Sequence, residues 1–113
     1  MKSALEITKL YFDLSNQGNL IAIEKLFQAD ATYSSVNTGL YFGVENIMPM
    51  MQDFFDAHQK LHWTTHQVKA LNEHVIELKF SCDAVSNEGK TKTISGVERV
   101  VVVDGLIRHI EVN

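Results

Sequence analysis

Residues 91–112 read TKTISGVERVVVVDGLIRHIEV, and the architecture can be worked out starting from this segment. β-Branched residues dominate it, and the pair Asp104-Gly105 divides it in two. Runs rich in valine, isoleucine and threonine are typical of strands, and Asp-Gly is typical of a two-residue hairpin turn. We therefore expect two antiparallel strands, Thr91–Val103 and Leu106–Val112.

The same signals extend upstream as far as residue 62. Two further strands are expected, His62–Ala70 and His74–Val85, and the turn Asn87–Lys90 leads from the second of them into Thr91–Val103. Consecutive strands joined by short turns form an antiparallel meander. The second half of the chain is therefore predicted to be a sheet.

Before residue 62 the apolar residues recur at three- and four-residue spacing, which is typical of amphipathic helices. The expected helices are Ser3–Asn16, Leu20–Phe27 and Gly43–Lys60. Ser3 and Glu6 have the spacing of a capping box, and Gly18 suits a left-handed helix end. A short strand, Ala29–Ser35, and a loop, Val36–Phe42, are expected between the helices.

Helices first and a meander last indicate a single α+β domain over residues 1–113, with helices covering one face of the sheet. Both faces of the last long strand are apolar. Val97, Val101 and Val103 alternate with Ile94, Val100 and Val102. A sheet that is apolar on both faces needs cover on both sides. We therefore predict a homodimer formed through the outer face of the sheet.

Composition argues against several classes of function. Of 113 residues, 45% are hydrophobic and 21% charged, and the net charge is −4. Basic residues are scattered, so nucleic acid and anionic membranes are not expected partners. No apolar run reaches the roughly 20 residues of a membrane span. The single cysteine, Cys82, and the lack of a secretory signal pattern near Met1 favour a reducing compartment, the cytoplasm.

Four short segments suggest a family: YFDLSNQGNL at 11–20, IEKLF at 23–27, DATY at 30–33 and GVENI at 43–47. Together they resemble the nuclear transport factor 2-like superfamily, and within it the SnoaL-like and ketosteroid-isomerase-like branch. The resemblance implies a cystatin-like cone, in which a strongly curved antiparallel sheet wraps around the N-terminal helices and encloses a pocket. The superfamily includes isomerases, dehydratases, cyclases, hydrolases and binding modules, so the fold leaves the activity open.

The resemblance also implies roles for individual residues. Tyr11 stands where ketosteroid isomerases place a tyrosine that donates a hydrogen bond to the substrate oxygen. Glu98 falls near the position of their second donor, a protonated acid on a late strand. Their proton-shuttling aspartate corresponds to Ser35, which has no useful basicity near neutral pH. The two donor positions are therefore retained in type, whereas the base is missing.

Strand alternation singles out Glu98 independently of any resemblance. Glu98 shares a face with Val100 and Val102, whereas Arg99 points to the other face. A carboxyl group on an apolar face is costly unless it is paired or protonated, and such groups are candidates for a functional site. The alternative is a structural role, with Glu98 partly exposed or paired with a buried histidine.

The histidines offer a candidate for proton transfer. His66 is expected to face Glu98 or Asp83 and to act as a proton shuttle, the alternative being a strand histidine satisfied by a neighbour. His62 and His66 lie four residues apart on a strand, about 13 Å from each other, which is too far to bind one metal ion. We expect neither a metal nor another cofactor.

Aromatic side chains are expected to line the pocket between helix and sheet. The candidate substrate-binding residues are Tyr33, Phe54, Phe55 and Trp63, with Phe55 and Trp63 at the mouth. Tyr11 lies on the apolar stripe of its helix, so its ring belongs either to the pocket or to the core.

Two functions remain open at this point. In the first, the pocket binds a small apolar or aromatic carbonyl compound, Tyr11 and Glu98 polarise its oxygen, and a histidine moves a proton, as in an isomerase, cyclase or dehydratase. In the second, the domain is a non-catalytic ligand-binding or dimerisation module with a vestigial pocket. The missing base at Ser35 motivates the second.

Overall fold

The computed structural model describes residues 1–113. Its first helix, α1, spans Ala4–Gln17 and begins with the expected capping box. The Glu6 N–H donates to Ser3 Oγ at 3.1 Å, and the Ser3 N–H donates to Glu6 Oε1 at 3.0 Å. Gly18 ends the helix in the left-handed conformation, with φ at 68°. The predicted helix is therefore confirmed to within one residue at each end.

Two shorter helices follow, α2 at Leu20–Glu24 and α3 at Val44–Asp56. The prediction that α2 reaches Phe27 is wrong, because the backbone there already belongs to the sheet. The Leu26 carbonyl accepts a hydrogen bond from the Ile107 N–H at 2.7 Å, and Phe27 pairs with Ile107. Tertiary pairing thus overrides the local helical pattern.

The six strands form one sheet. They are β1 at Phe27–Ser35, β2 at Gly39–Phe42, β3 at His58–Ala70, β4 at Val75–Ser86, β5 at Thr91–Val103 and β6 at Leu106–Val112. Their order is β2-β1-β6-β5-β4-β3. The predicted meander, β3 to β6, is confirmed as antiparallel, but β1 joins β6 in parallel, so the sheet is not antiparallel throughout.

The strands differ from the prediction in several places, and β1 begins at Phe27, two residues earlier than expected. The segment expected to be a loop contains β2, which pairs with β1 from Thr32↔Phe42 to Ser35↔Gly39. Strand β3 begins at His58 instead of residue 62, since His58 pairs with Ser86. Strand β4 begins one residue later than expected. A four-residue strand between two glycines is too short to show a period in sequence, and only its partner reveals it.

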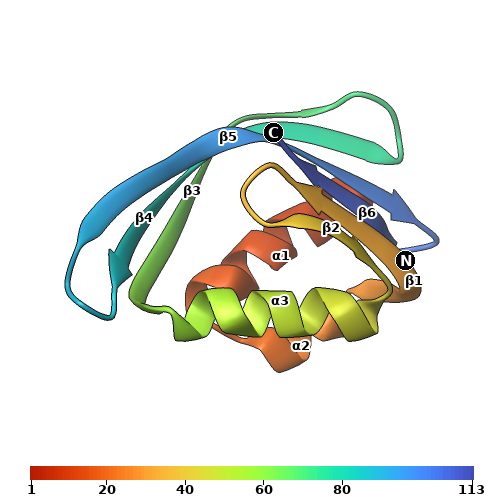
Figure 1. Cartoon of the computed structure of the whole chain (residues 1–113). Coiled ribbons are helices and arrows are strands. Elements are labelled where there is room, and N and C mark those ends of the chain that lie inside the picture. Colours follow the sequence, from red (N-terminus) through yellow and green to blue (C-terminus); the bar gives the residue numbers. More distant parts are fainter.

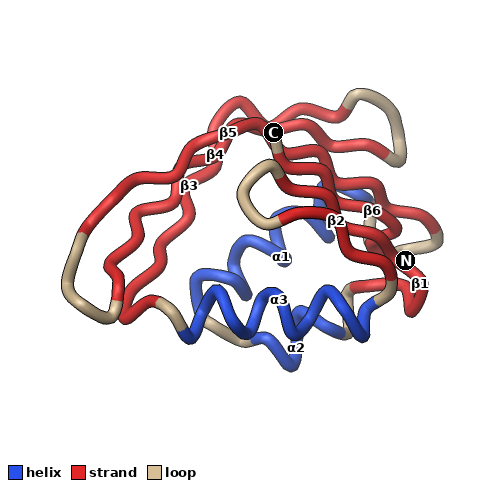
Figure 2. The backbone as a smooth tube through the Cα atoms, viewed as in Figure 1, coloured by secondary structure: helices blue, strands red, loops and turns tan.

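The sheet arches over the helices, with α1 beneath the arch and α3 across its base (Figures 1 and 2). The core lies between this concave face and the helices. Its largest fully buried apolar side chains are Ile23, Ile47, Ile76, Leu78, Val100, Ile107 and Ile110. No helix has the length and apolar character that crossing a membrane requires.

The outer face of the sheet is more polar than its sequence pattern predicts. Glu77 accepts from Arg99 Nε at 2.9 Å, and Thr93 Oγ1 donates to Asp83 Oδ1 at 2.9 Å. Three outward-facing valines, Val97, Val101 and Val103, are half-buried between such groups. The outer face is therefore mixed, whereas the inner face is apolar.

Candidate functional site

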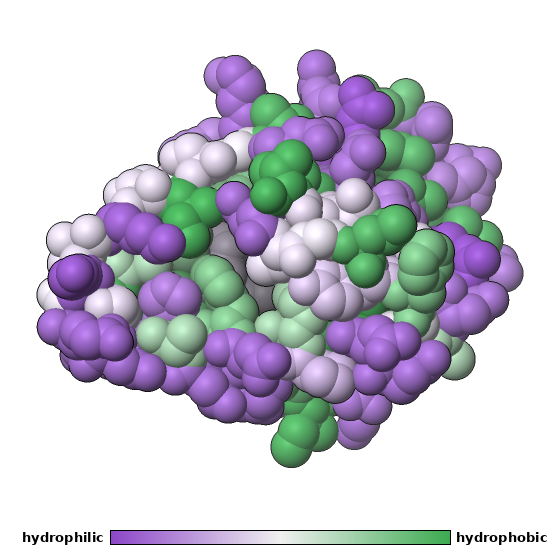
Figure 3. Space-filling view, in the orientation of Figure 1, coloured by the Kyte–Doolittle hydropathy of each residue, from purple (hydrophilic) through white to green (hydrophobic).

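A cavity lies between α1, α3 and the inner face of the sheet, and Figure 3 shows its mouth as a hollow above α3. The lining residues are Tyr11, Phe12, Ser15, Tyr33, Ser35, Asn37, Thr38, Met50, Met51, Phe54, Phe55, Trp63, Phe80, Cys82, Ile94, Glu98 and Val112. The space open to the centre of a water molecule is about 80 Å³. That is enough for several water molecules or one compact organic group, since a single water needs about 10–15 Å³ on this measure.

Glu98 is the one acidic or basic side chain in this lining. It is 4% exposed, on the inner face of β5, and its Oε2 is buried without a hydrogen-bond partner. Burial disfavours the charged form and raises the pKa of Glu98 to about 8. The inner-face position predicted from strand alternation is therefore confirmed, and no buried histidine pairs with Glu98.

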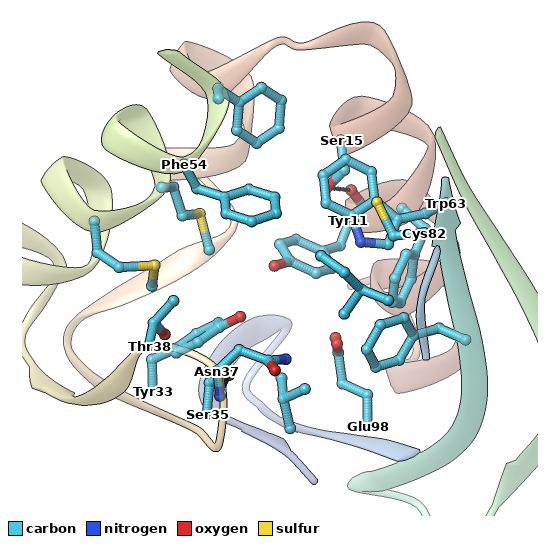
Figure 4. Close-up of a pocket in the computed structure, with 17 residues that line it drawn as sticks. Tyr11, Ser15, Tyr33, Ser35, Asn37, Thr38, Phe54, Trp63, Cys82 and Glu98 are labelled. Carbon is cyan, nitrogen blue, oxygen red and sulfur yellow. Dashed lines mark hydrogen bonds between the residues drawn. The ribbon is translucent and has the colours of Figure 1, made fainter. Parts of the chain in front are cut away.

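Two tyrosine hydroxyls and the Glu98 carboxyl group point into the open centre of the cavity (Figure 4). Tyr11 comes from α1 and Tyr33 from β1. Burial raises the pKa of each phenol well above its ordinary value, and the negative charge of Glu98 raises it further. Both phenols therefore stay protonated and remain hydrogen-bond donors at neutral pH.

Ser35 carries a structural hydroxyl at the edge of the cavity. Ser35 Oγ accepts a hydrogen bond from the Asn37 N–H at 3.0 Å and holds the turn that follows β1. Tyr41 Oη donates to the Thr38 carbonyl at 2.9 Å and holds the same turn from its other side. This turn brings Asn37 and Thr38 to the cavity. Ser35 therefore shapes the cavity wall.

Three of the four predicted aromatic residues, Phe54, Phe55 and Trp63, meet at one wall of the cavity, and the fourth, Tyr33, lines it from β1. The rings of Phe55 and Trp63 stack with centroids 5.6 Å apart, and Phe54 lies 6.3 Å from Trp63. Asn16, in α1, holds Trp63 in place through two backbone contacts. Asn16 Nδ2 donates to the Trp63 carbonyl at 3.0 Å, and the Trp63 N–H donates to Asn16 Oδ1 at 2.7 Å. The clamp fixes the edge strand β3 against the end of α1.

The structure does not bring His66 to the cavity. On β3, Trp63 pairs with Cys82 on the inner face, whereas His66 pairs with Lys79 on the outer face. His66 is exposed, and its Nε2 lies 3.5 Å from Ser81 Oγ. The sheet therefore separates His66 from Glu98, and the expected histidine shuttle is wrong in its placement. Strand alternation places His66 on the face opposite to Trp63, because their positions in the strand differ by an odd number.

Several lining residues were missed by the sequence interpretation. Asn37 and Thr38 lie in a turn without any period, so no local signal points to them. Cys82, 1% exposed, and Phe80 alternate on the inner face of β4, and strand alternation makes them detectable once Glu98 is assigned to that face. Burial raises the pKa of the Cys82 thiol to about 11, so it stays neutral.

A model of the SnoaL-like domain family matches residues 8–110, which is most of the chain. The chain belongs to the SnoaL-like family. No curated protein matches the sequence closely enough to count as a relative. The family match confirms the SnoaL-like resemblance inferred from the opening segments and agrees with the cone-shaped α+β fold.

Solved structures similar to this SnoaL-like chain share its fold at low sequence identity. A Mycobacterium tuberculosis protein in complex with estradiol-17beta-hemisuccinate has a TM-score of 0.87 at 17% identity, covering 98% of this chain and 93% of its own. A cystatin-fold protein from Novosphingobium aromaticivorans has 0.86 at 12%, covering 100% and 99%. The epoxide hydrolase/cyclase-like enzyme SalBIII, of pyran ring formation in salinomycin, has 0.85 at 16%, covering 96% and 88%.

Proposed function

We propose that this SnoaL-like protein binds a compact apolar carbonyl compound and moves a proton on the carbon next to the carbonyl. Isomerases, cyclases and dehydratases share this step. The observation that carries the proposal is Glu98, a carboxyl group with a raised pKa and an unpartnered oxygen, aimed with two phenols into an apolar cavity. Similar folds that bind a steroid derivative or act as a cyclase-like enzyme support this class of ligand.

Each of the three oxygen-bearing groups has a distinct role in the proposal. Tyr11 and Tyr33 donate hydrogen bonds to the carbonyl oxygen and stabilise the negative charge that develops there. Glu98 takes the proton from the neighbouring carbon and returns it to the same carbon or to another one. The role that the sequence interpretation gave to a histidine falls to Glu98, because the cavity lining contains no histidine.

The raised pKa suits Glu98 to this role. With a pKa of about 8, roughly a tenth of the molecules carry the ionised carboxylate at pH 7, and that carboxylate is a much stronger base than an ordinary one. Because the same group is readily reprotonated, it can also return the proton. A group with a pKa near the working pH serves both steps.

Exchange of α-protons into deuterated water tests the proposal without knowledge of the natural substrate. The probe is 2-tetralone, a compact ketone with a fused aromatic ring, followed by proton NMR in deuterated buffer. We expect the purified protein to accelerate loss of the α-proton signals above the buffer rate. No acceleration at concentrations where 2-tetralone binds would contradict proton transfer.

The second candidate function is ligand binding without turnover. Ser35, at the position of the base in ketosteroid isomerases, is engaged in holding the turn after β1, and this favours the second candidate. The same experiment separates the two. Binding of 2-tetralone, seen as a change in the emission of the single tryptophan, Trp63, together with an unchanged exchange rate would favour a binding module.

We also propose a homodimer formed through the outer face of the sheet. The half-buried valines of that face support it, with Val101 between Val75 and His109 on the neighbouring strands. We expect sedimentation velocity to find a dimer that Val101→Asp dissociates, because a buried unpaired carboxylate is costly. Ile21→Asp, which places the same charge at a 78%-exposed apolar position of α2 away from the sheet, is the matched control and should leave the dimer intact. A monomeric wild-type protein at high concentration would contradict the proposal.

A further inference from the structure

A second hollow adjoins the cavity on its outer side, between β2 and α3. Its own lining residues are Leu40, Tyr41, Phe42, Asn46, Pro49 and Asp53. Three residues, Thr38, Met50 and Phe54, line both this groove and the cavity. Groove and cavity therefore share a wall, and in Figure 3 the hollow above α3 lies beside the surface of β2.

The aromatic rings of the hairpin connect the two spaces. Tyr33 lines the cavity, and Tyr41 lines the groove. Their rings meet edge to face, with centroids 6.4 Å apart. Thr38, Met50 and Phe54 therefore form the boundary between the two spaces, and two of these three side chains are apolar.

Size indicates why a ligand would use both spaces. The cavity holds about 80 Å³, whereas sites for ordinary small molecules measure about 300–1,000 Å³. The groove adds about 640 Å³, part of it open to solvent. The cavity by itself accommodates only a compact head group, and a ligand of ordinary size extends into the groove.

The chemistry of the groove suits an apolar tail. Leu40 is 59% exposed and Phe42 62% exposed, which is unusual for side chains of this size in a strand. Asp53 is the only charged lining residue, so nothing in the groove attracts an anionic group. The Asn46 amide is occupied, because its Nδ2 donates to the Phe42 carbonyl at 2.7 Å.

We propose that the groove between β2 and α3 binds the apolar tail of a two-part ligand whose oxygen-bearing head lies in the cavity. This inference rests on the proposed function, because it assumes that the head is held by Tyr11, Tyr33 and Glu98. The ligand class is then a carbonyl or enol compound carrying an uncharged hydrocarbon extension.

A series of 4-alkylphenols from methyl to hexyl tests the groove. A phenol is planar and carries its oxygen as an enol does, so it mimics the head group. Binding is measured from the emission of Trp63, excited at a wavelength that phenols do not absorb. We expect the dissociation constant to fall about two- to fourfold for each added methylene, because burying one CH₂ group stabilises a complex by up to about 0.8 kcal/mol.

The double variant Leu40→Thr/Phe42→Thr removes the exposed apolar surface and keeps β-branched residues in the strand. In this variant the dissociation constant should no longer fall much from 4-methylphenol to 4-hexylphenol. The dissociation constant of 4-methylphenol itself should change by no more than about twofold, which is much less than the effect of the added methylenes in the wild type. Leu40→Thr alone should show a smaller loss and serves if the double variant is unstable. The matched control is Ile21→Ala, which removes a 78%-exposed apolar side chain from α2, outside the groove.

The outcomes separate this inference from the proposed function. If 4-methylphenol binds but longer chains bind no better, the groove proposal is wrong and the cavity proposal stands. If the double variant weakens 4-methylphenol as much as 4-hexylphenol, the groove proposal is also wrong. If no phenol binds at all, the proposed function fails together with it.

Discussion

Replacing Glu98 with glutamine is expected to lower the rate of catalysed α-proton exchange by about 10²- to 10⁴-fold, the usual contribution of a positioned acid or base. The amide has almost the same size and still forms hydrogen bonds, but it cannot take up a proton. No other side chain replaces it, because Glu98 is the only carboxyl group in the cavity lining. The measurement is the exchange of 2-tetralone α-protons by NMR, at saturating protein where possible.

The control for this variant is Glu111→Gln. Glu111 lies on β6 between the buried Ile110 and Val112, so its carboxyl group faces away from the cavity. Its replacement should leave the exchange rate unchanged. If Glu98→Gln retains the wild-type rate, Glu98 is not the proton carrier and the proposed mechanism is wrong.

The pH dependence of exchange distinguishes a base from an acid at this position. If ionised Glu98 removes the proton, the wild-type rate rises with pH and levels off above a pKa of about 8. If protonated Glu98 instead polarised the carbonyl oxygen, the rate would fall over the same range. A falling profile would therefore overturn the base role while leaving the location of the site unaffected.

The second large effect is on stability. Glu98 has a pKa of about 8 in the folded protein against 4.5 for an ordinary glutamate, so between these values the folded state binds more protons than the unfolded state. The free energy of unfolding is then highest below about pH 4.5 as far as Glu98 is concerned. It falls by up to about 1.4 kcal/mol per pH unit until about pH 8, and changes no further above that. The whole loss is on the order of 5 kcal/mol.

Glu98→Gln should abolish this loss, because an amide does not ionise. As the pH rises from 4.5 to 9, the stability of Glu98→Gln relative to the wild type should therefore increase by several kcal/mol. Urea unfolding at a series of pH values measures it. Parallel curves for the two proteins would mean that Glu98 has an ordinary pKa and lies in a polar environment. A wild-type protein less stable than a variant without function is expected where a site needs an unpaired buried group.

Local patterns predicted most of the elements. The capping box of Ser3 and Glu6, the left-handed Gly18 and the Asp104-Gly105 turn each satisfy a requirement of a few neighbouring residues, so sequence reveals them directly. Alternation along β5 also assigned Glu98 to the apolar face. Because such patterns report only local requirements, they did not predict β2 or the strand conformation at Phe27, which depend on pairing with distant strands.

The same distinction between local and tertiary requirements applies to the candidate site. The sequence by itself determined that an acid lies on the apolar face of a late strand and that a tyrosine lies on the inner stripe of α1. The sequence also predicted Tyr33 as a pocket-lining residue. Only the tertiary structure decided that the Tyr33 hydroxyl shares the cavity with Glu98 and Tyr11, that Asn37 and Thr38 complete the wall, and that His66 lies across the sheet. Periodicity reports which face of its own element a residue occupies. It does not report which faces of distant elements meet, because that depends on how β1 adds to β6 and how the sheet curves over α1.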